Sequence, residues 1–220
     1  MSEPTFTPAL GRLAPVRFYD LVMKLSREST WRGLVVERAA PGPGETVVDV
    51  GCGTGSQALL LHRSQPEARI IGVDPDPAVL AIAREKAAKA GAGDAIEWRG
   101  GFGEEAAEIA GPGTAAVVVS SLVLHQCPME TKRSLLSSMH RVLAPGGRLV
   151  IADFGLQRTR AMRLGFRVVV QLADGVEDTQ PNADGAIPGL IAEAGFADVQ
   201  EAAVVKTLGG AISIYTAARG

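Results

Sequence analysis

The chain has 220 residues, of which 46% are hydrophobic and 21% are charged, and its formal net charge is -2. This length fits one α/β domain, and this composition argues against disorder. The near balance of 22 basic and 24 acidic residues gives no general attraction to nucleic acid or to an anionic membrane, so either partner would need a local basic patch. The sequence contains no run of 18 apolar residues, which excludes a transmembrane segment within it.

Cysteine content and the N-terminal sequence indicate the compartment. Cys52 and Cys127 are too few for a disulfide framework. The N-terminus has no basic segment followed by an apolar region, so it does not resemble a secretory signal. We therefore expect a cytoplasmic protein.

The first 40 residues are predicted to be helical. Apolar residues recur there at helical spacing and precede a second segment, WRGLVVERA, that ends before the PGPG sequence at 41–44. The apolar residues are Phe18, Leu21, Val22 and Leu25. We expect residues 1–40 to form a helical cap and residues 41–220 to form the domain that it covers.

Short β-branched runs that end in Gly, Asp or Ser predict buried parallel strands. These runs lie at 45–50, 69–74, 115–120 and 147–153, with a weaker one at 95–99. Helical stretches at 56–63, 77–91 and 130–143 alternate with them, which predicts right-handed βαβ units. The last two strands, 198–206 and 211–218, are separated only by TLGG, so they are predicted to form an antiparallel hairpin.

A glycine-rich turn follows the first predicted strand. In VVDVGCGTGSQALLL, Gly51, Gly53 and Gly55 connect a buried strand directly to an apolar helix. Glycine permits positive φ and lets backbone N–H groups approach a ligand. Asp74 ends the second strand about 20 residues later, where its carboxylate can accept hydrogen bonds from both hydroxyls of a ribose. These features predict an adenosine-containing cofactor; a tight turn without a ligand and a surface carboxylate are the alternatives.

Three features resemble class I methyltransferases that use S-adenosylmethionine (SAM). DVGCGTG resembles their cofactor motif more than the dinucleotide fingerprint, RVLAPGGRLVIAD at 141–153 resembles the turn into their fifth strand, and the TLGG hairpin matches their reversed seventh strand. The resemblance covers about residues 15–218. It implies a Rossmann-like α/β sandwich whose seven-stranded, mostly parallel sheet has the order 3-2-1-4-5-7-6. A nicotinamide oxidoreductase is the rival enzyme class, disfavoured by the PGG turn and the reversed strand.

The resemblance also implies a set of cofactor-binding residues and no metal. Asp49 corresponds to the acidic residue near the methionine ammonium, and Asp74 to the ribose ligand. The other predicted cofactor residues are Gly51, Gly53, Gly55, Pro75, Gly101, Phe102 and Ser120. Where the family commonly has Gly-Asp-Ala, this chain has RGGFGEE. Either Glu104 or Glu105 replaces that Asp, or the backbone around Gly101 and Phe102 reads the adenine.

Two residues are predicted to take part in the reaction. Methyl transfer from a sulfonium requires alignment and exclusion of water, with no fixed triad. His125, in SSLVLHQCP just past the fourth strand, is predicted to act as a base for an amine or a phenol; a structural histidine is the alternative. Tyr19, beside Asp20 in APVRFYDLVMKL, resembles the N-terminal Tyr of ubiquinone/menaquinone-type and bacterial phospholipid N-methyltransferases. That resemblance implies that Tyr19 closes over the cofactor, and packing onto the domain is the alternative.

Acceptor recognition is expected in an insertion at about 155–185. Arg160, Arg163 and Arg167 fall on one helical face there, with apolar residues on another, and no acidic residue occurs from 156 to 172. Such a helix can bind an anionic headgroup or interface, and a solvated Arg face is the alternative. His62 and His140 are expected to be structural.

The predicted function is transfer of a methyl group from SAM to N, O or C of a small-molecule acceptor. A phosphatidylethanolamine-type phospholipid N-methyltransferase, with peripheral membrane contact, is one alternative. A non-catalytic SAM-binding regulator or accessory subunit is another. A nucleic-acid substrate is not expected, because the chain has no basic surplus and no Asn/Asp-Pro-Pro-Tyr motif after the fourth strand.

Overall fold

The computed structural model describes residues 27–220, which fold around one seven-stranded sheet. Short buried runs rich in Val and Ile form its centre, as expected for parallel strands covered on both faces. The strands are β1 (Thr46–Val50), β2 (Arg69–Asp74), β3 (Ile96–Gly100), β4 (Ala115–Ser121), β5 (Leu143–Phe154), β6 (Ala197–Thr207) and β7 (Gly210–Ala218).

The strand order is β3-β2-β1-β4-β5-β7-β6, which confirms the order implied by the sequence. The first five strands pair in parallel, whereas β7 pairs antiparallel with both β5 and β6. The carboxyl ends of β1 to β5 therefore meet at one edge of the sheet. In parallel α/β sheets, ligands bind in the crevice outside that edge.

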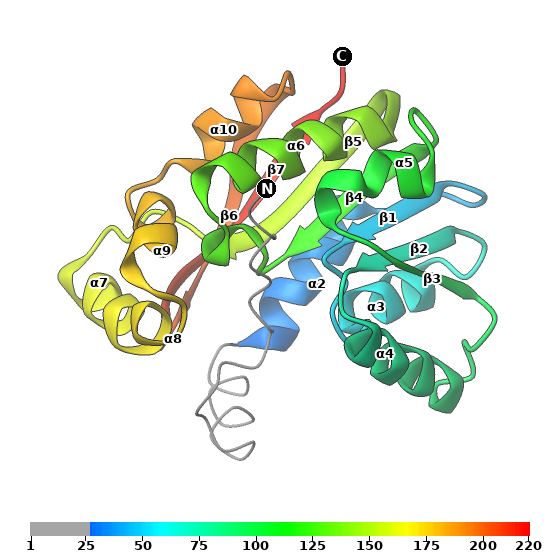
Figure 1. The fold of residues 1–220 in the computed structure, drawn as a ribbon, viewed down its shortest axis with the longest axis horizontal. Helices are drawn as coiled ribbons and strands as arrows, with labels where there is room; N and C mark the ends of the chain where they lie inside the picture. The colour runs from blue at the N-terminus through cyan, green and yellow to red at the C-terminus, as the bar shows by residue number, and fades with distance from the viewer. Residues whose placement is uncertain (1–26) are drawn as a thin grey trace, which may run out of the picture.

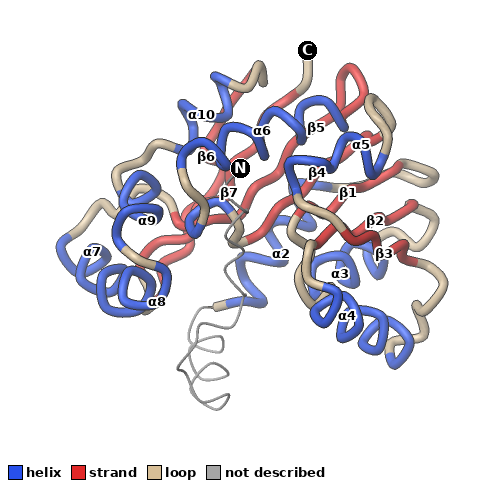
Figure 2. Tube along the Cα trace, in the orientation of Figure 1, coloured by secondary structure: helices blue, strands red, loops and turns tan. Residues whose placement is uncertain are grey.

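Helices cover both faces of the sheet (Figures 1 and 2). On one face α5 (Ala106–Ala110), α6 (Met129–Val142) and α10 (Ile187–Glu193) bury alternate strand residues such as Val48 and Ile151. On the other face α2 (Glu28–Ala39), α3 (Ser56–Ser64) and α4 (Pro77–Lys89) bury the intervening ones, such as Val47 and Val150. This period of two follows from the pleat of a strand, and it makes the sheet the centre of the hydrophobic core.

The PGG sequence lies within β5, not before it as the sequence pattern predicts. β5 pairs with β4 at Leu143, and regular pairing resumes only at Arg148. The residues between form an irregular segment in which Gly146 has a φ of +74°. Glycine adopts that φ without the steric cost that a Cβ would add, so the chain bulges and then rejoins the sheet.

An insertion follows β5. It contains α7 (Arg160–Phe166), a π-helical segment η3 (Arg167–Gln171), the short α8 (Leu172–Asp174) and α9 (Val176–Ala183). Phe166, Val170 and Ala183 form a small apolar cluster of their own, against Phe154 of β5. The insertion lies beside the carboxyl edge of the sheet, at the end of the molecule drawn at the left of Figure 1.

Within residues 27–220, none of the helices has the length and apolar character needed to cross a bilayer. Phe18, Leu21, Val22 and Leu25, and with them most of the predicted helical cap, lie outside the described residues. The second predicted N-terminal helix, WRGLVVERA, is present as the greater part of α2.

Candidate functional site

The glycine-rich turn connects β1 to α3 at the carboxyl edge of the sheet. Gly51, Gly53 and Gly55 all have positive φ, at +72°, +52° and +75°. A Cβ on Gly51 would lie 2.3 Å from Val123 Cγ2, and one on Gly55 would lie 2.4 Å from the Trp98 ring. A Cβ on Gly53 would meet nothing within 4 Å. Two of the glycines are therefore required by packing inside the protein, and Gly53 faces open space.

Asp74 holds this turn from the end of β2. Its Oδ2 accepts from the Gly53 N–H at 2.9 Å, and its Oδ1 accepts from the Asp76 N–H at 3.0 Å, across Pro75. Burial raises the pKa of Asp74, although these two N–H groups oppose that shift. Each carboxylate oxygen retains lone-pair capacity, because an ionised carboxylate has about four acceptor sites. The geometry fits a carboxylate that is fixed by the backbone and still able to accept two ribose hydroxyls.

Asp49 lies inside β1 and is 1% exposed. Neither of its carboxylate oxygens makes a hydrogen bond within the described residues. Burial raises its pKa to about 7, while the charge of Arg32 and the amide of Ala58 oppose the rise. A buried carboxylate without a partner is costly, and a cationic ligand removes that cost. The site thus has an unsatisfied group of the kind that binds an amino-acid ammonium.

The third strand ends at the predicted adenine-binding residues. Gly101 has a φ of +151°, and a Cβ there would lie 2.4 Å from Ile109 Cδ1. The Phe102 N–H donates to Glu105 Oε2 at 3.3 Å, and the Phe102 side chain is 37% exposed. Since Glu105 accepts from the Phe102 N–H, it is less available to contact adenine, and Glu104, Phe102 and the backbone of Gly101 remain the candidates.

Ser120 lies at the end of β4, between β1 and β5. Its hydroxyl is buried and donates to Val50 O at 2.8 Å, so it supports the strand that leads into the glycine turn. Two residues later Leu122 has a φ of +57°, a conformation that non-glycine residues seldom adopt. The segment after β4 is thus held in a strained shape beside the turn.

His125 follows β4 and is buried between two carboxylates. Its Nδ1 lies 2.9 Å from Asp153 Oδ1, and its Nε2 lies 3.5 Å from Asp174 Oδ2. Burial alone would lower the pKa of His125, but the two carboxylates outweigh it and raise the pKa to about 9. At neutral pH the ring is therefore an imidazolium whose two N–H groups both face an acceptor. This geometry favours the structural alternative for His125, because a base needs a free lone pair.

Asp153, at the end of β5, organises the segment after β4. Its Oδ2 accepts from the N–H groups of Val123 and Leu124 at 3.0 and 2.7 Å. Its Oδ1 accepts from the Phe154 N–H at 2.7 Å as well as meeting His125. We did not identify Asp153 from the sequence. The sequence does indicate it, because the predicted central strand GRLVIAD ends in this carboxylate.

Two lysines were also missed. Lys86 of α4 donates to Thr54 Oγ1 at 2.8 Å and to Ser56 Oγ at 2.9 Å, on both sides of Gly55. Lys132 of α6 is 0% exposed and donates to two backbone carbonyls, of Cys127 at 2.5 Å and of Asp178 at 2.7 Å. Lys86 therefore supports the cofactor side of the site, and Lys132 joins the segment after β4 to the insertion.

The remaining candidates have simpler positions. Tyr19 and Asp20 lie outside the described residues. Burial raises the pKa of the Cys127 thiol to about 12 and raises that of Cys52 further, so neither is a thiolate at neutral pH. His62 lies in α3, and His140 lies in α6 with its ring edge-on to Phe196. Neither histidine is among the predicted cofactor residues.

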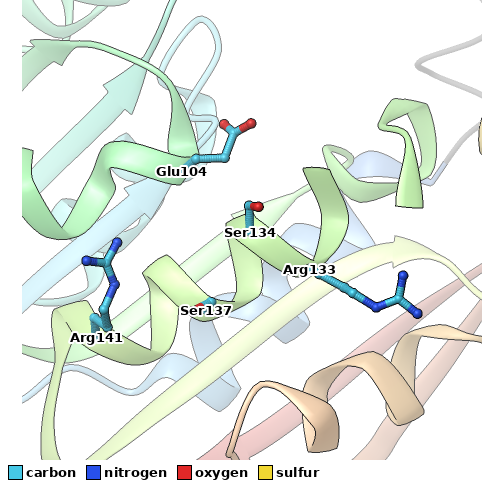
Figure 3. A pocket seen from close by; sticks show the side chains of 5 residues that line it. All are labelled: Glu104, Arg133, Ser134, Ser137 and Arg141. Carbon is cyan, nitrogen blue, oxygen red and sulfur yellow. The ribbon is translucent and has the colours of Figure 1, made fainter. Parts of the chain in front are cut away.

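A hollow of about 450 Å³ is lined by residues of α6 and by Glu104. Figure 3 shows its lining residues, with Arg133 and Arg141 pointing in different directions from the helix. Each of these arginines pairs with a glutamate, Glu193 and Glu108 respectively. Glu104, one of the two glutamates considered for the adenine, lines this hollow, but none of the residues predicted to bind the ribose or the methionine ammonium does, so we do not assign the hollow to the cofactor.

A sheet of this order, with a glycine turn after β1 and carboxylates at the ends of β2 and β5, defines a Rossmann-like methyltransferase fold. A family model described as "Methyltransferase domain" matches residues 47–147. An O-methyltransferase family protein from Burkholderia thailandensis has a TM-score of 0.74 and 21% identity, over 92% of this chain and 58% of that chain. At this identity the structural similarity supports the fold alone.

Sequence relatives extend the similarity beyond the fold. A demethylmenaquinone methyltransferase from Thermus thermophilus is 34% identical over 70% of this chain and 68% of its own length. An arsenite methyltransferase from Halobacterium salinarum is 34% identical over 73% of this chain, but the match spans only 36% of that relative. The chain belongs to the class I SAM-dependent methyltransferase family.

Proposed function

We propose that the chain transfers a methyl group from SAM to N, O or C of a small-molecule acceptor at the carboxyl edge of its sheet. The observation that carries the proposal is a pair of carboxylates at the glycine turn: Asp49 in the strand that leads into the turn, and Asp74, which accepts from the Gly53 N–H. Asp49 is buried without a partner, and Asp74 is fixed with acceptor capacity to spare. SAM has the complementary groups, a cationic ammonium and two ribose hydroxyls. The two relatives are named for different small acceptors, arsenite and demethylmenaquinone. Their names therefore support a small-molecule acceptor but do not identify it.

The chain's own residues would bind and align the two reactants. Bound SAM supplies an electrophilic methyl group on its sulfonium. In the proposal Asp49 binds the ammonium, Asp74 binds the ribose, and Phe102 lies against the adenine. Because the displacement needs alignment and a dry site, most of the acceleration would come from positioning.

For His125 we propose the positioning role. Its contacts with Asp153 and Asp174 hold the segment after β4 against the insertion, beside the expected place of the acceptor. If His125 were instead the base, kcat would depend on its loss of a proton. A His125→Gln variant with wild-type pH dependence of kcat supports the positioning role, whereas loss of one limb of the profile supports the base.

The N-terminal cap and the insertion complete the proposal. On resemblance alone, we propose that Tyr19 closes over the bound cofactor and that the N-terminal part of the predicted cap covers the site, because α2, at residues 28–39, packs on a face of the sheet as part of the core. Residues 155–185 would recognise the acceptor. A Tyr19→Phe variant with unchanged SAM affinity and unchanged turnover would remove Tyr19 from the site.

The test is calorimetric titration with SAM and S-adenosylhomocysteine, with NADH as control, followed by a labelled-methyl screen of amines, phenols, quinols and phosphatidylethanolamine vesicles. SAM binding with label in one acceptor class supports the proposal. Binding without turnover on any acceptor favours a SAM-binding regulator, and NADH binding without SAM binding would revive the oxidoreductase. Absence of SAM binding would contradict the proposal outright.

Asp49 gives the same titration a second readout. The ammonium pairs with the carboxylate form, and the free protein holds Asp49 protonated below about pH 7. SAM affinity should therefore fall as the pH drops from 8 to 6, by at most about tenfold per pH unit. Asp49→Asn should remove this dependence, and Asp94→Asn, at an exposed position, should keep it.

A further inference from the structure

The end of the molecule formed by the insertion exposes a row of large apolar side chains. Leu164, Val168 and Leu172 recur at every fourth position through α7, η3 and α8, and they are 63%, 54% and 79% exposed. Nearby buried residues, such as Phe166 and Val170, already form the cluster that holds the insertion to β5. The exposed side chains of this row are therefore not needed to hold the insertion to the sheet. Contiguous exposed apolar surface usually marks an interaction site.

The β6–β7 hairpin extends this row. Leu208, in the turn between the two strands, is 62% exposed. A Cβ on Gly165 would lie 2.3 Å from the Leu208 carbonyl oxygen, so α7 and the hairpin turn are in direct contact. Figure 1 shows the ends of β6 and β7 beside the insertion. Two segments more than thirty residues apart in sequence therefore contribute to one apolar surface.

Basic side chains border this surface. Arg160, Arg163 and Arg167 are exposed on the adjoining face of the same helical segment, and Lys206 is exposed beside the hairpin turn. None of the four forms an ion pair with any residue from 27 to 220. By contrast, Arg158 at the start of the segment pairs with Glu201. No acidic residue occurs at 156–172 or at 202–220.

The acidic side chains of the insertion lie after residue 172. Asp174 contacts His125, and Asp184 accepts from Gln180 and lines a small hollow together with Arg163 and Arg167. Glu177 and Asp184 are exposed, but neither forms an ion pair with an arginine among residues 27–220. The surface formed by residues 156–172 and the hairpin turn is therefore apolar with a basic border, in a chain whose net charge is -2. An apolar strip bordered by cations is the pattern of segments that lie in the interface of an anionic bilayer.

We propose that this surface, Leu164, Val168, Leu172 and Leu208 bordered by Arg160, Arg163, Arg167 and Lys206, docks on an anionic lipid bilayer. The apolar side chains enter the headgroup region, and the cations meet lipid phosphates. A second copy of the chain fits less well, because a two-fold contact through this face brings two sets of unpaired arginines together.

Docking would place the reaction site next to the lipid. β6 runs parallel to β5, so the hairpin turn lies at the same edge of the sheet as the glycine turn. An acceptor dissolved in or attached to the bilayer would then reach the carboxyl edge without crossing bulk water. This consequence rests on the proposed function, whereas the docking itself does not.

The test is co-sedimentation of the full chain with phosphatidylcholine vesicles, with and without about a third of phosphatidylserine. We expect binding to the anionic vesicles that weakens with added salt and little binding to the neutral ones. Leu164→Ser/Leu172→Ser and Arg160→Gln/Arg167→Gln should each reduce the partition coefficient by about tenfold or more. Arg163 is kept, because its Nε donates to Gln157 O.

Matched controls replace exposed residues elsewhere. Ile82→Ser changes an exposed apolar residue of α4, and Arg38→Gln/Arg63→Gln changes two exposed arginines of α2 and α3. Both should bind vesicles as the wild type does. Residues 1–26 are present in every variant, so a difference between variants reports on the surface itself.

Three outcomes would overturn the proposal. They are equal binding to neutral and anionic vesicles, no binding to either, and dimerisation that Leu164→Ser/Leu172→Ser abolishes, which would assign the face to a second copy. Calorimetric titration of the same preparations with SAM tests the proposed function independently. A protein that binds SAM but not anionic vesicles would contradict the docking proposal alone.

Discussion

The proposed cofactor side and the proposed acceptor side of the carboxyl edge are held together by different kinds of contact. On the cofactor side, Asp74 accepts from backbone N–H groups of the glycine turn and of its own turn, so the geometry comes from short segments with recognisable sequences. On the acceptor side, His125 and Lys132 reach residues of the insertion that are far away in sequence. The cofactor side is therefore specified by local motifs, and the acceptor side depends on tertiary packing.

The largest expected effect is on the unfolding free energy, when the hydrogen bonds of Lys132 on the acceptor side are removed. Lys132→Met removes two hydrogen bonds and leaves the carbonyls of Cys127 and Asp178 without their donor, at a cost of about 2 to 4 kcal/mol of unfolding free energy. Urea unfolding measures this. Lys89→Met, at an exposed position, should change the unfolding free energy by less than about 0.5 kcal/mol. An equal loss in both variants would contradict a structural role for Lys132.

The next effect is on the cofactor side. Asp74→Ala should weaken SAM binding by about 1.5 to 3 kcal/mol, the range for a hydrogen bond to a charged group. Calorimetric titration gives the value, with Asp94→Asn as the control that leaves affinity unchanged. If SAM binds Asp74→Ala as tightly as the wild type, Asp74 does not belong to the site.

The pH dependence of stability probes the acceptor side again. The folded-state pKa of His125, about 9, exceeds its ordinary value of 6.5, so its stabilising contribution is full below pH 6.5 and is lost as the pH rises through 9. Relative to wild type, His125→Gln should lose on the order of 1 to 3 kcal/mol at pH 6 and much less at pH 10. Urea unfolding at both pH values measures this, with His140→Gln as the control. A difference that does not change with pH would show that the charge of His125 contributes nothing.

The smallest expected effect is on SAM affinity and tests the role of Lys86 on the cofactor side. Lys86→Met removes the donor to Thr54 and Ser56 and should weaken SAM binding by about 1 kcal/mol, whereas Lys86→Arg should restore part of the affinity. Lys89→Met, three residues away in the same helix, should bind SAM as the wild type does. A positioning role for Lys86 also requires that the KM for the acceptor stay unchanged, and a shift in that KM would argue for a wider disturbance.

The same division explains how far the sequence predicted the structure. The range predicted for β2, 69–74, is the observed one, because a β-branched run between turn residues suffices to define a buried strand. The positions of Gly51, Gly53 and Gly55 followed from one contiguous motif. The bulge inside β5 was missed, because it depends on where pairing with β4 resumes.

The position of the insertion was predicted only in outline, and its role in acceptor recognition stays a prediction. The insertion was expected at about 155–185, and its helices span 160–183. Lys132 and Asp178 are 46 residues apart, and no periodicity within either segment indicates that they meet. Asp153 had a sequence signal as a strand-end carboxylate, but its four contacts require the fold of the segment after β4.

The contacts of Lys132 have an evolutionary consequence. Its ammonium group bonds to backbone carbonyls, which every residue type possesses, so substitutions at positions 127 and 178 leave both bonds available. The insertion can therefore diverge in side chains while it stays attached to the same helix. If the insertion recognises the acceptor as proposed, point mutations in it can change the acceptor while the attachment to α6 is kept.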